Sequence, residues 1–377
     1  MSFGKPATAA VVAAFALAFA AQAATPGVTD KEILIGQDVD LSGAIAVRMK
    51  PLNQAADAYF EKVNAAGGVN GRKIRILRLD SANKPDKTKE NLKTFEKEGV
   101  FAMWALSGTG NTAAALPTLT EKGIPLIAST SGADAFFVKK NPLLFNLKAG
   151  YGDEIRRMMV HLKESYTTRV GIVYIDNGFG KEALKTAQEA MKANGLELTA
   201  VAGHKEDKSD IDAAVQKVAD SKPAAVLALT LSGPAPDVIA AYVKTGHKTQ
   251  IFALSIVAAD ALYKTIGDRS RGVIVTQIVP YPQDRTNLVV REYQDLVLAK
   301  GVKDFSHAGV EGYVYAKTLV EGLQAAGRNL TREGLVTAFE RMQRDLGGMK
   351  MAFSPTSHNG SDFVEITMIG REGKLVR

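Results

Sequence analysis

The sequence predicts an α/β protein built from two doubly wound lobes, each a parallel sheet with helices on both faces. Short apolar runs alternate with helical patterns along the chain, and this alternation is typical of parallel strands joined by crossover helices. The pattern runs once, is interrupted at residues 146–153 by a stretch containing glycine and lysine, and then starts again. A chain of 377 residues is also long enough for two domains of ordinary size.

The first lobe is predicted from four apolar runs with helical patterns between them. The helix after the first run is expected to begin at Pro51, because proline suits the first turn, and to end at Gly67 and Gly68. The next helix, over residues 84–98, is highly charged, and a further helix begins at Asn111. The strands are expected at residues 33–36, 74–79, 101–106 and 124–129.

The second lobe repeats this rhythm after the interruption. Its helices are expected to begin at Gly180, Ser209 and Asp237. A second crossover between the lobes is expected at residues 273–282, which end in a Pro-Tyr-Pro sequence. The strands are expected at residues 170–175, 196–202, 225–231 and 251–254.

The last hundred residues are expected to return to both lobes. Helical patterns cover residues 287–300, 308–327 and 331–343, and a last strand covers residues 363–369. If these helices rejoin the first lobe and the tail rejoins the second, three segments connect the lobes, which permits rigid closure about a multi-strand hinge. The predicted domains are then residues 24–148 with 280–346 for the first lobe, and residues 149–279 with 347–377 for the second.

Residues 1–23 have the pattern of a signal peptide that directs export. Lys5 is their only charge, an apolar run covers residues 7–21, and Ala21 and Ala23 place small residues where a peptidase would cleave after Ala23. The run is too short to span a bilayer, and the alternative is a disordered or buried alanine-rich helix. The chain has no cysteine. This excludes a lipid anchor on a new N-terminal cysteine and excludes disulfides, so large apolar cores must stabilise the mature protein.

The net charge of +7 raises the question of nucleic-acid binding. Basic residues are interspersed with acidic ones, as in Glu90-Asn91-Leu92-Lys93 and Glu96-Lys97-Glu98, and such mixing is typical of solvated helix faces. We therefore expect no nucleic-acid partner, and we interpret the positive charge as a mild bias toward anionic ligands.

Several motifs follow one another in an order that identifies a known family. Residues 64–74 have the sequence Asn-Ala-Ala-Gly-Gly-Val-Asn-Gly-Arg-Lys-Ile, preceded by Leu41-Ser42-Gly43 and followed by Asp80. Further matches are Pro125, Phe179-Gly180, Gly246 and Glu311-Gly312-Tyr313. The chain thereby resembles the type I periplasmic binding proteins, and most of all the leucine/isoleucine/valine-binding branch. The resemblance implies a monomeric solute-binding protein of the periplasm that needs no cofactor and delivers its ligand to the inner-membrane permease of an ABC importer.

Two loops of the first lobe are the predicted anchor for the ligand. Residues 107–112 and 128–133 follow neighbouring strands and are rich in hydroxyls and glycine, and free N–H groups at a helix N-terminus suit a carboxylate. The resemblance assigns contact with the ligand's carboxylate to four positions in these loops, which are Gly108, Thr109, Thr130 and Gly132. The alternative is that these serines and threonines only cap helices. The first loop lacks the spacing and lysine of a phosphate-binding P-loop.

Aromatic side chains are expected to form the walls of the cleft. The resemblance places Phe179 where relatives have a tyrosine that packs on the ligand, and it matches Tyr313 to a cleft tyrosine from a later helix. Tyr151, just past the first crossover, is a third candidate. A lone aromatic residue on an apolar stripe is more often part of the core, so this alternative stays open for each of them.

Two departures from the amino-acid binders bear on the ligand. Ser255 stands where those relatives place the carboxylate that holds the ligand's ammonium group, and a buried ammonium without a counter-charge is costly. Arg48 stands where they often carry an aromatic residue, and an arginine in the cleft favours a planar anion. Alternatively, Arg48 lies on the surface or pairs with Asp40 or Glu311, and Glu311 itself can replace the missing ammonium acceptor. We therefore expect an aromatic or aliphatic carboxylic acid first and a branched-chain or other amino acid second.

Other functional classes fit the sequence less well. The five histidines are scattered without metal-ligand spacing, so no metal site is expected, and there is neither a Gly-x-Ser-x-Gly motif nor a cysteine nucleophile. We therefore expect no enzyme activity and no catalytic residues. A binding protein that presents its ligand to a membrane receptor kinase would use the same two-lobed fold, so a sensor remains the alternative to transport.

Overall fold

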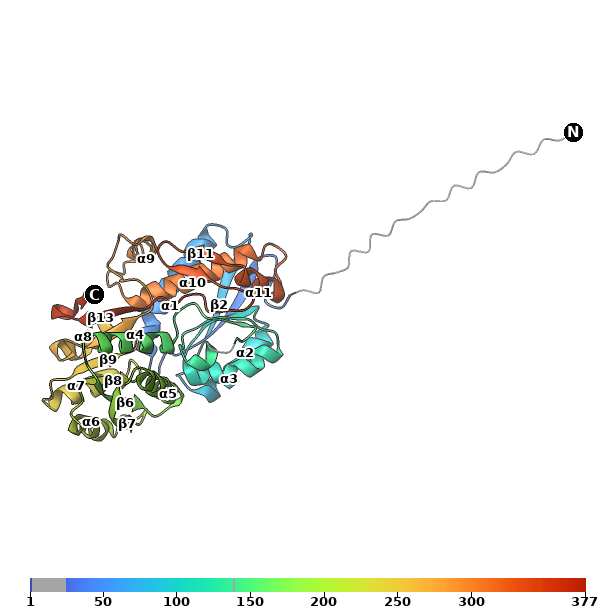
Figure 1. The fold of residues 1–377 in the computed structure, drawn as a ribbon. Coiled ribbons are helices and arrows are strands. Elements are labelled where there is room, and N and C mark those ends of the chain that lie inside the picture. The colour runs from blue at the N-terminus through green and yellow to red at the C-terminus, as the bar shows by residue number, and fades with distance from the viewer. Residues whose placement is uncertain (2–24, 138–139) are drawn as a thin grey trace.

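The computed structural model describes Met1, residues 25–137 and residues 140–377, and it folds them into two lobes with one large sheet each (Figure 1). This architecture confirms the predicted fold class. The predicted signal peptide lies outside the described residues except for Met1. Among the described residues, no helix is both long and apolar enough to cross a bilayer.

The first sheet is entirely parallel and has the strand order β2-β1-β3-β4-β5. Every residue of β3 and β4 is buried, because helices cover both faces. In a parallel sheet the carboxyl ends of neighbouring strands meet at one edge, so the loops after β3, β4 and β5 lie together. The strands are β1 Glu32–Val39, β2 Lys73–Asp80, β3 Ala102–Leu106, β4 Leu126–Ser129 and β5 Leu144–Phe145.

The helices of the first lobe come from both ends of the chain. Figure 1 shows α10 lying along α1, which confirms that the late helices return to this lobe. The contact is close at Gly312, where a Cβ atom would stand 2.0 Å from the carbonyl oxygen of Leu52, so only glycine fits. The elements are α1 Ala46–Ala65, α2 Pro85–Glu98, α3 Thr109–Glu121, α9 Leu288–Leu298, α10 His307–Ala325 and α11 Arg332–Glu340, with the hairpin β11 Gln343–Asp345 and β12 Lys350–Ala352.

The second sheet has the order β14-β13-β10-β9-β8-β6-β7 and is parallel except for β13 and β14. The antiparallel pairing of β13 with β10 brings the C-terminal tail back to this lobe, as predicted. The strands are β6 Arg169–Ile175, β7 Glu197–His204, β8 Ala225–Leu229, β9 Gln250–Ala253, β10 Ile274–Gln277, β13 Glu365–Ile369 and β14 Leu375–Val376. The helices are α4 Tyr151–Glu164, α5 Gly178–Ala193, α6 Ile211–Asp220, α7 Ala235–Lys244 and α8 Ala259–Ile266.

Several helices differ from the prediction, and α8 had no predicted counterpart. For two helices the structure shows the cause. Helix α1 begins at Ala46 and contains Pro51, because the Asp40 carboxylate accepts hydrogen bonds from the N–H groups of Gly43 and Ile45 and so organises the turn before Pro51. Helix α4 was not predicted, and the expected crossover at residues 146–153 ends where this helix begins. Asp153 accepts a hydrogen bond from the Gly150 N–H and caps α4 at Tyr151.

Three segments of the chain pass between the lobes, and two of them run side by side. Asn146 of the first segment accepts a hydrogen bond from the N–H of Gly360 in the third and donates one to the carbonyl of His358. The hairpin β11–β12 spans the boundary predicted between residues 346 and 347. The lobe boundaries themselves stay a prediction.

Candidate functional site

The lobes enclose a cavity of about 70 Å³ where the carboxyl ends of strands from both sheets face each other. The first lobe contributes Gly108, Thr109 and Thr130 to its wall, and the second contributes Phe179 together with Ile256. Most of the residues proposed from the sequence therefore meet here, although they come from distant parts of the chain.

Helix α3 points its N-terminus at this cavity. Gly108 precedes the helix with φ 91°, a conformation that favours glycine, and a Cβ atom there would come within 2.4 Å of Asn83 Oδ1. No side chain among the described residues caps the helix. The first N–H groups of α3 are thus available to an acceptor in the cavity, and the helix dipole favours a negative one.

The hydroxyl groups of the two loops are not equivalent. Thr109 Oγ1 and Ser131 Oγ share a hydrogen bond of 2.8 Å, and Thr112 Oγ1 bonds Ser129 Oγ at 2.8 Å. Thr130 lines the cavity with a fully buried hydroxyl that has no hydrogen-bond partner among the described residues. A buried hydroxyl without a partner is costly, so Thr130 is the group in these loops that most needs a ligand atom.

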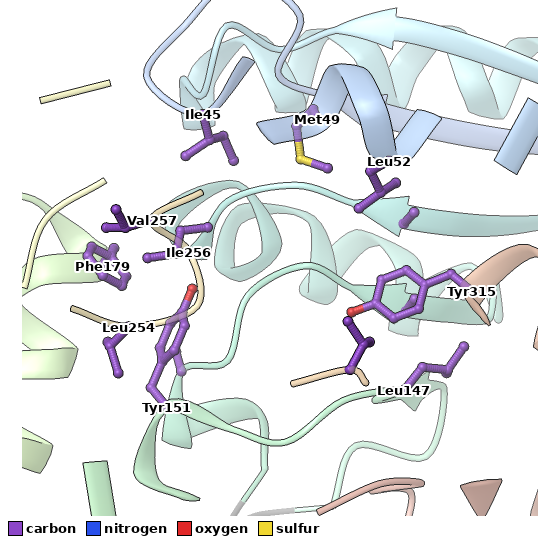
Figure 2. Close-up of a cluster of buried hydrophobic side chains, with 14 of the residues drawn as sticks. Ile45, Met49, Leu52, Leu147, Tyr151, Phe179, Leu254, Ile256, Val257 and Tyr315 are labelled. Carbon is purple, nitrogen blue, oxygen red and sulfur yellow. The ribbon is translucent and has the colours of Figure 1, made fainter. Parts of the chain in front are cut away.

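Tyr151 and Phe179 form an aromatic wall across the interface between the lobes. Their ring centroids are 5.1 Å apart with planes at 79°, and Figure 2 shows the pair beside Ile256 and opposite Ile45 of the first lobe. The Tyr151 N–H donates to the carbonyl oxygen of Gly132 at 2.6 Å, which fixes the ring against the second loop. Burial raises the pKa of Tyr151, so its hydroxyl stays protonated and able to donate.

Ser255 is held by a carboxylate that the sequence analysis missed. Glu154 of α4, fully buried, accepts hydrogen bonds from the Ser255 N–H at 2.7 Å, from the Ser255 hydroxyl at 2.9 Å and from Thr276 Oγ1. Burial raises the pKa of Glu154, while Lys148 and these donors oppose that effect. A signal was present in the sequence, because Glu154 lies on the apolar stripe of α4 with Ile155 and Met158.

Arg48 and Glu311 form a buried ion pair, with exposures of 2% and 1%. Arg48 Nε also donates to the carbonyl oxygen of Ser255 at 3.4 Å, which links the lobes. Arg48 is therefore not on the surface, and its carboxylate partner is Glu311 rather than Asp40. One guanidinium nitrogen, Nη1, and one carboxylate oxygen, Oε1, have no hydrogen-bond partner among the described residues.

Tyr313 lies apart from the other proposed residues. Its hydroxyl donates to Glu292 at 2.7 Å, and its ring packs edge-on against Tyr59 at 5.2 Å. Two residues along a helix correspond to about 200° around its axis, so Glu311 faces the interface between the lobes while Tyr313 faces α1 and α9. The cleft contact expected for Tyr313 is not present in this arrangement.

Lys148 is a second residue that the sequence analysis missed. It follows β5 and is completely buried, its Nζ has no hydrogen-bond partner among the described residues, and it stands 5.0 Å from the ring centroid of Tyr151. Burial lowers the pKa of Lys148, while Glu311 and Glu154 oppose that effect. The sequence signal was a charged residue three positions after a short apolar strand, in a stretch that was predicted only as a crossover.

The two lobes touch directly around the cavity. The Gly233 N–H donates to the carbonyl oxygen of Ala44 at 2.8 Å, and a Cβ atom on Gly178 would stand 3.9 Å from the Cα of Gly110. These backbone contacts leave little space between the lobes outside the cavity. Within the described part of the chain, no group of three or more acidic or histidine side chains is placed to hold a metal ion.

Comparisons with known proteins agree with the fold. The family model described as "Periplasmic binding protein" matches residues 32–374. A curated relative, Leu/Ile/Val-binding protein homolog 1 of Brucella abortus (strain 2308), is 24% identical over 329 residues, which cover 84% of this chain and 85% of the relative. A solved structure, the substrate-binding periplasmic protein from Ralstonia solanacearum, is 31% identical with a TM-score of 0.86 and covers 92% of this chain and 99% of its own.

A more distant solved structure shares the fold alone. It is a branched chain amino acid ABC transporter protein from Thermus thermophilus with bound valine, and it is 15% identical with a TM-score of 0.82. The match covers 92% of this chain and 95% of that chain.

Proposed function

This chain belongs to the periplasmic binding protein family, a family of substrate-binding proteins rather than enzymes, and from this premise we propose a specific role for it. It is the periplasmic component of an ABC importer, and it closes its two lobes over a small carboxylate-bearing solute. The single observation that carries the proposal is the cavity, where the uncapped N-terminus of α3 and the unpartnered hydroxyl of Thr130 face apolar side chains of the other lobe.

The acidic group of the solute is placed at the first lobe. The N–H groups at the start of α3 and the hydroxyls of Thr109, Thr130 and Ser131 are hydrogen-bond donors that suit a carboxylate. The Tyr151 hydroxyl, which stays protonated, adds a donor from the start of the second lobe. Donors of this kind, fixed before binding, lose little entropy when the ligand arrives.

The body of the solute is placed against apolar side chains. Phe179, Leu231 and Ile256 approach from the second lobe, and Ile45 approaches from the first. The lobes enclose this cavity, whose volume is about 70 Å³, so the solute enters while the lobes stand apart and the lobes then close over it.

The lining favours an acid without an ammonium group. The Ser255 hydroxyl is committed to Glu154, whose two oxygens already accept from Ser255 and Thr276, and Glu311 is committed to Arg48. Glu311 Oε1 has no hydrogen-bond partner among the described residues, but the charge of Glu311 is already balanced by Arg48. A buried ammonium ion needs a counter-charge, which favours an acid without an ammonium group.

An amino acid is the second candidate, and one observation favours it. Glu206 is the one carboxylate among the residues that line the cavity. Its side chain is exposed and accepts a hydrogen bond from Asn177 at 2.7 Å, so it stands at the rim rather than in the interior. An ammonium group reaching this rim would be paired there in water, at a small gain in affinity.

Transport rather than sensing completes the proposal. Export by a signal peptide cleaved after Ala23 brings the protein to the periplasm, where the closed form docks on an inner-membrane permease as a monomer. Figure 1 shows the C-terminus at the surface of the second lobe, beside β13.

A thermal-shift screen of the mature protein against aromatic acids, aliphatic acids, dicarboxylates and amino acids tests this function. A bound solute stabilises the folded state by about 4 kcal/mol at a thousandfold excess over its Kd. Solution scattering with the best solute should show a more compact protein than without it. If no solute in any class raises the midpoint of unfolding, or if the protein converts one of them chemically, the proposed function is wrong.

A further inference from the structure

We propose that Lys148 is the cation that pairs with the acidic group of the bound solute, and that the solute is therefore an anion overall. This inference rests on the proposed function and deepens it, because it names the residue that sets the charge of the ligand. It follows from the position of Lys148, from its lack of a contacting partner, and from the way the nearby charges are already paired.

The position of Lys148 follows from the order of strands in the first sheet. Strands β4 and β5 are parallel, with Ile127 beside Phe145. Thr130 is the first residue after β4 and Lys148 is the third residue after β5, so both follow the carboxyl ends of neighbouring strands, at the sheet edge where α3 also begins. The tyrosine ring beneath the Lys148 ammonium group belongs to Tyr151, which lines the cavity. Lys148 thus stands behind the same loops that present donors to the solute.

The ammonium group of Lys148 has nothing in contact to balance it. Its side chain is completely buried, and Nζ makes no hydrogen bond to any described residue. A buried charge without a hydrogen-bonded partner destabilises a protein by several kcal/mol. Burial of an unpartnered lysine against Tyr151, a residue that lines the cavity, is understandable where a ligand supplies the missing negative charge.

The neighbouring carboxylates do not fill this role. Glu311 is bound to Arg48, and Glu154 is bound by Ser255 and Thr276. Both carboxylates attract Lys148 from a distance and raise its pKa against the effect of burial, so they help to keep it charged. They leave its three N–H donors unused, together with the unpartnered hydroxyl of Thr130.

These donors define the class of solute. A carboxylate that accepts from the start of α3 and from Thr130 on one side, and from Lys148 on the other, satisfies groups that the protein leaves unpaired. An ammonium group on the same solute would be repelled by Lys148. The inferred ligands are therefore carboxylic acids with an apolar body and no amino group.

The experiment compares two lysines that each lie over a tyrosine ring. Lys148→Met removes the proposed ligand contact, and Lys317→Met is its matched control, because Lys317 stands 5.8 Å from the Tyr313 ring and far from the cavity. Calorimetric titrations use benzoate, phenylacetate and 4-methylpentanoate as probes, together with the uncharged amide of each. Thermal unfolding without any probe is measured for all three proteins.

The expected results separate a ligand contact from a structural role. Lys148→Met should raise the Kd for the best acid by roughly 30-fold or more, as for the loss of one partner of a buried charge pair. It should leave the unliganded midpoint unchanged or higher, because an unpaired buried charge is removed. Lys317→Met should do the reverse, with a lower midpoint and an unchanged Kd.

The outcomes that contradict the inference are equally distinct. An unchanged Kd in Lys148→Met, or a midpoint lowered as in Lys317→Met without loss of affinity, makes Lys148 a structural residue and leaves the proposed function intact. If Lys148→Met does not fold, the titrations of the wild-type protein test the inference instead. Equal Kd values for an acid and its uncharged amide would show that no cation of the protein pairs with the carboxylate. Failure of every probe and every amino acid to bind the wild-type protein contradicts the proposed function itself.

Discussion

Within the described residues, two lysines lie over a tyrosine ring, and they differ in what surrounds the ammonium group. Lys317 lies over Tyr313 inside the first lobe, and both side chains hydrogen-bond to Glu292, at 2.6 Å and 2.7 Å. Lys148 lies over Tyr151 at the interface between the lobes and has no such partner among the described residues. The lysine–tyrosine pair inside the first lobe is complete, because Glu292 accepts hydrogen bonds from both side chains. The pair at the interface is incomplete, because Lys148 has no acceptor among the described residues. We interpret the first pair as structural and the second as part of the binding site.

The largest effect on stability is expected at the Arg48–Glu311 ion pair, where both charges at the interface between the lobes are paired. Replacing either Arg48 or Glu311 by methionine leaves its partner buried and uncompensated, which should lower the free energy of unfolding by about 3–5 kcal/mol. The double replacement removes both charges and should recover most of that loss. Urea denaturation of the single and double variants measures the coupling. If the single variants are as stable as the wild type, the Arg48–Glu311 pair does not stabilise the folded protein, and the contrast with the unpaired Lys148 is lost.

An intermediate effect, on affinity rather than stability, is expected at Thr130, whose hydroxyl has no partner among the described residues. Thr130→Val removes a hydroxyl that has no partner among the described residues, so stability should change little, while the Kd for an acidic solute should rise roughly tenfold. Thr112→Val is the matched control, because Thr112 already bonds Ser129 and the Gly108 carbonyl. That variant should lose stability by about 1 kcal/mol. Calorimetry gives the Kd and thermal unfolding gives the stability of each variant. If the two variants change in Kd and in stability by the same amounts, Thr130 is not a ligand-binding residue distinct from Thr112.

The smallest effect is expected at the complete lysine–tyrosine pair. Glu292 is partly exposed; burial tends to raise its pKa, but hydrogen bonds from Lys317 and Tyr313 outweigh this and the pKa is lowered. Because the folded-state pKa lies below the unfolded one, the contribution to stability is present above about pH 4.3 and is lost as the pH falls through the folded-state value. Lys317→Met should therefore cost about 1 kcal/mol or less at pH 7 and progressively less in acid. Urea denaturation at pH 7 and at lower pH tests this, and a difference that grows in acid would contradict it.

Much of the fold was predictable because its signals are local. The alternation of apolar runs and helices indicated two parallel sheets, and the glycine-rich sequence at residues 64–74 carried the resemblance. The start of α1 was misplaced because Asp40 organises the preceding turn through side-chain hydrogen bonds that no periodicity reports. Pro51 was tolerated one turn further in than expected.

The site was less predictable because its contacts are made across the chain. Arg48 and Glu311 are separated by 263 residues, and nothing in either local sequence favours their pairing over a bond from Arg48 to Asp40 or a place on the surface. Tyr313 was placed in the cleft by the resemblance alone, but its side chain contacts Glu292 and Tyr59 inside the first lobe. Lys148 was overlooked because burial of a lysine depends on how two lobes pack, and single-sequence patterns contain no information on that packing.

The meeting of Gly178 with Gly110 has a practical consequence for study of this protein. The Cβ atom of an alanine at residue 178 would stand 3.9 Å from the Cα of Gly110 on the other lobe. A longer side chain at this position would therefore hold the two lobes apart. Such a side chain would belong to the second lobe, so the residues of the anchoring loops in the first lobe would stay unchanged, although it would press on Gly110 of one of these loops. The affinity of the first lobe alone for a solute could then be measured separately from the affinity of the closed protein.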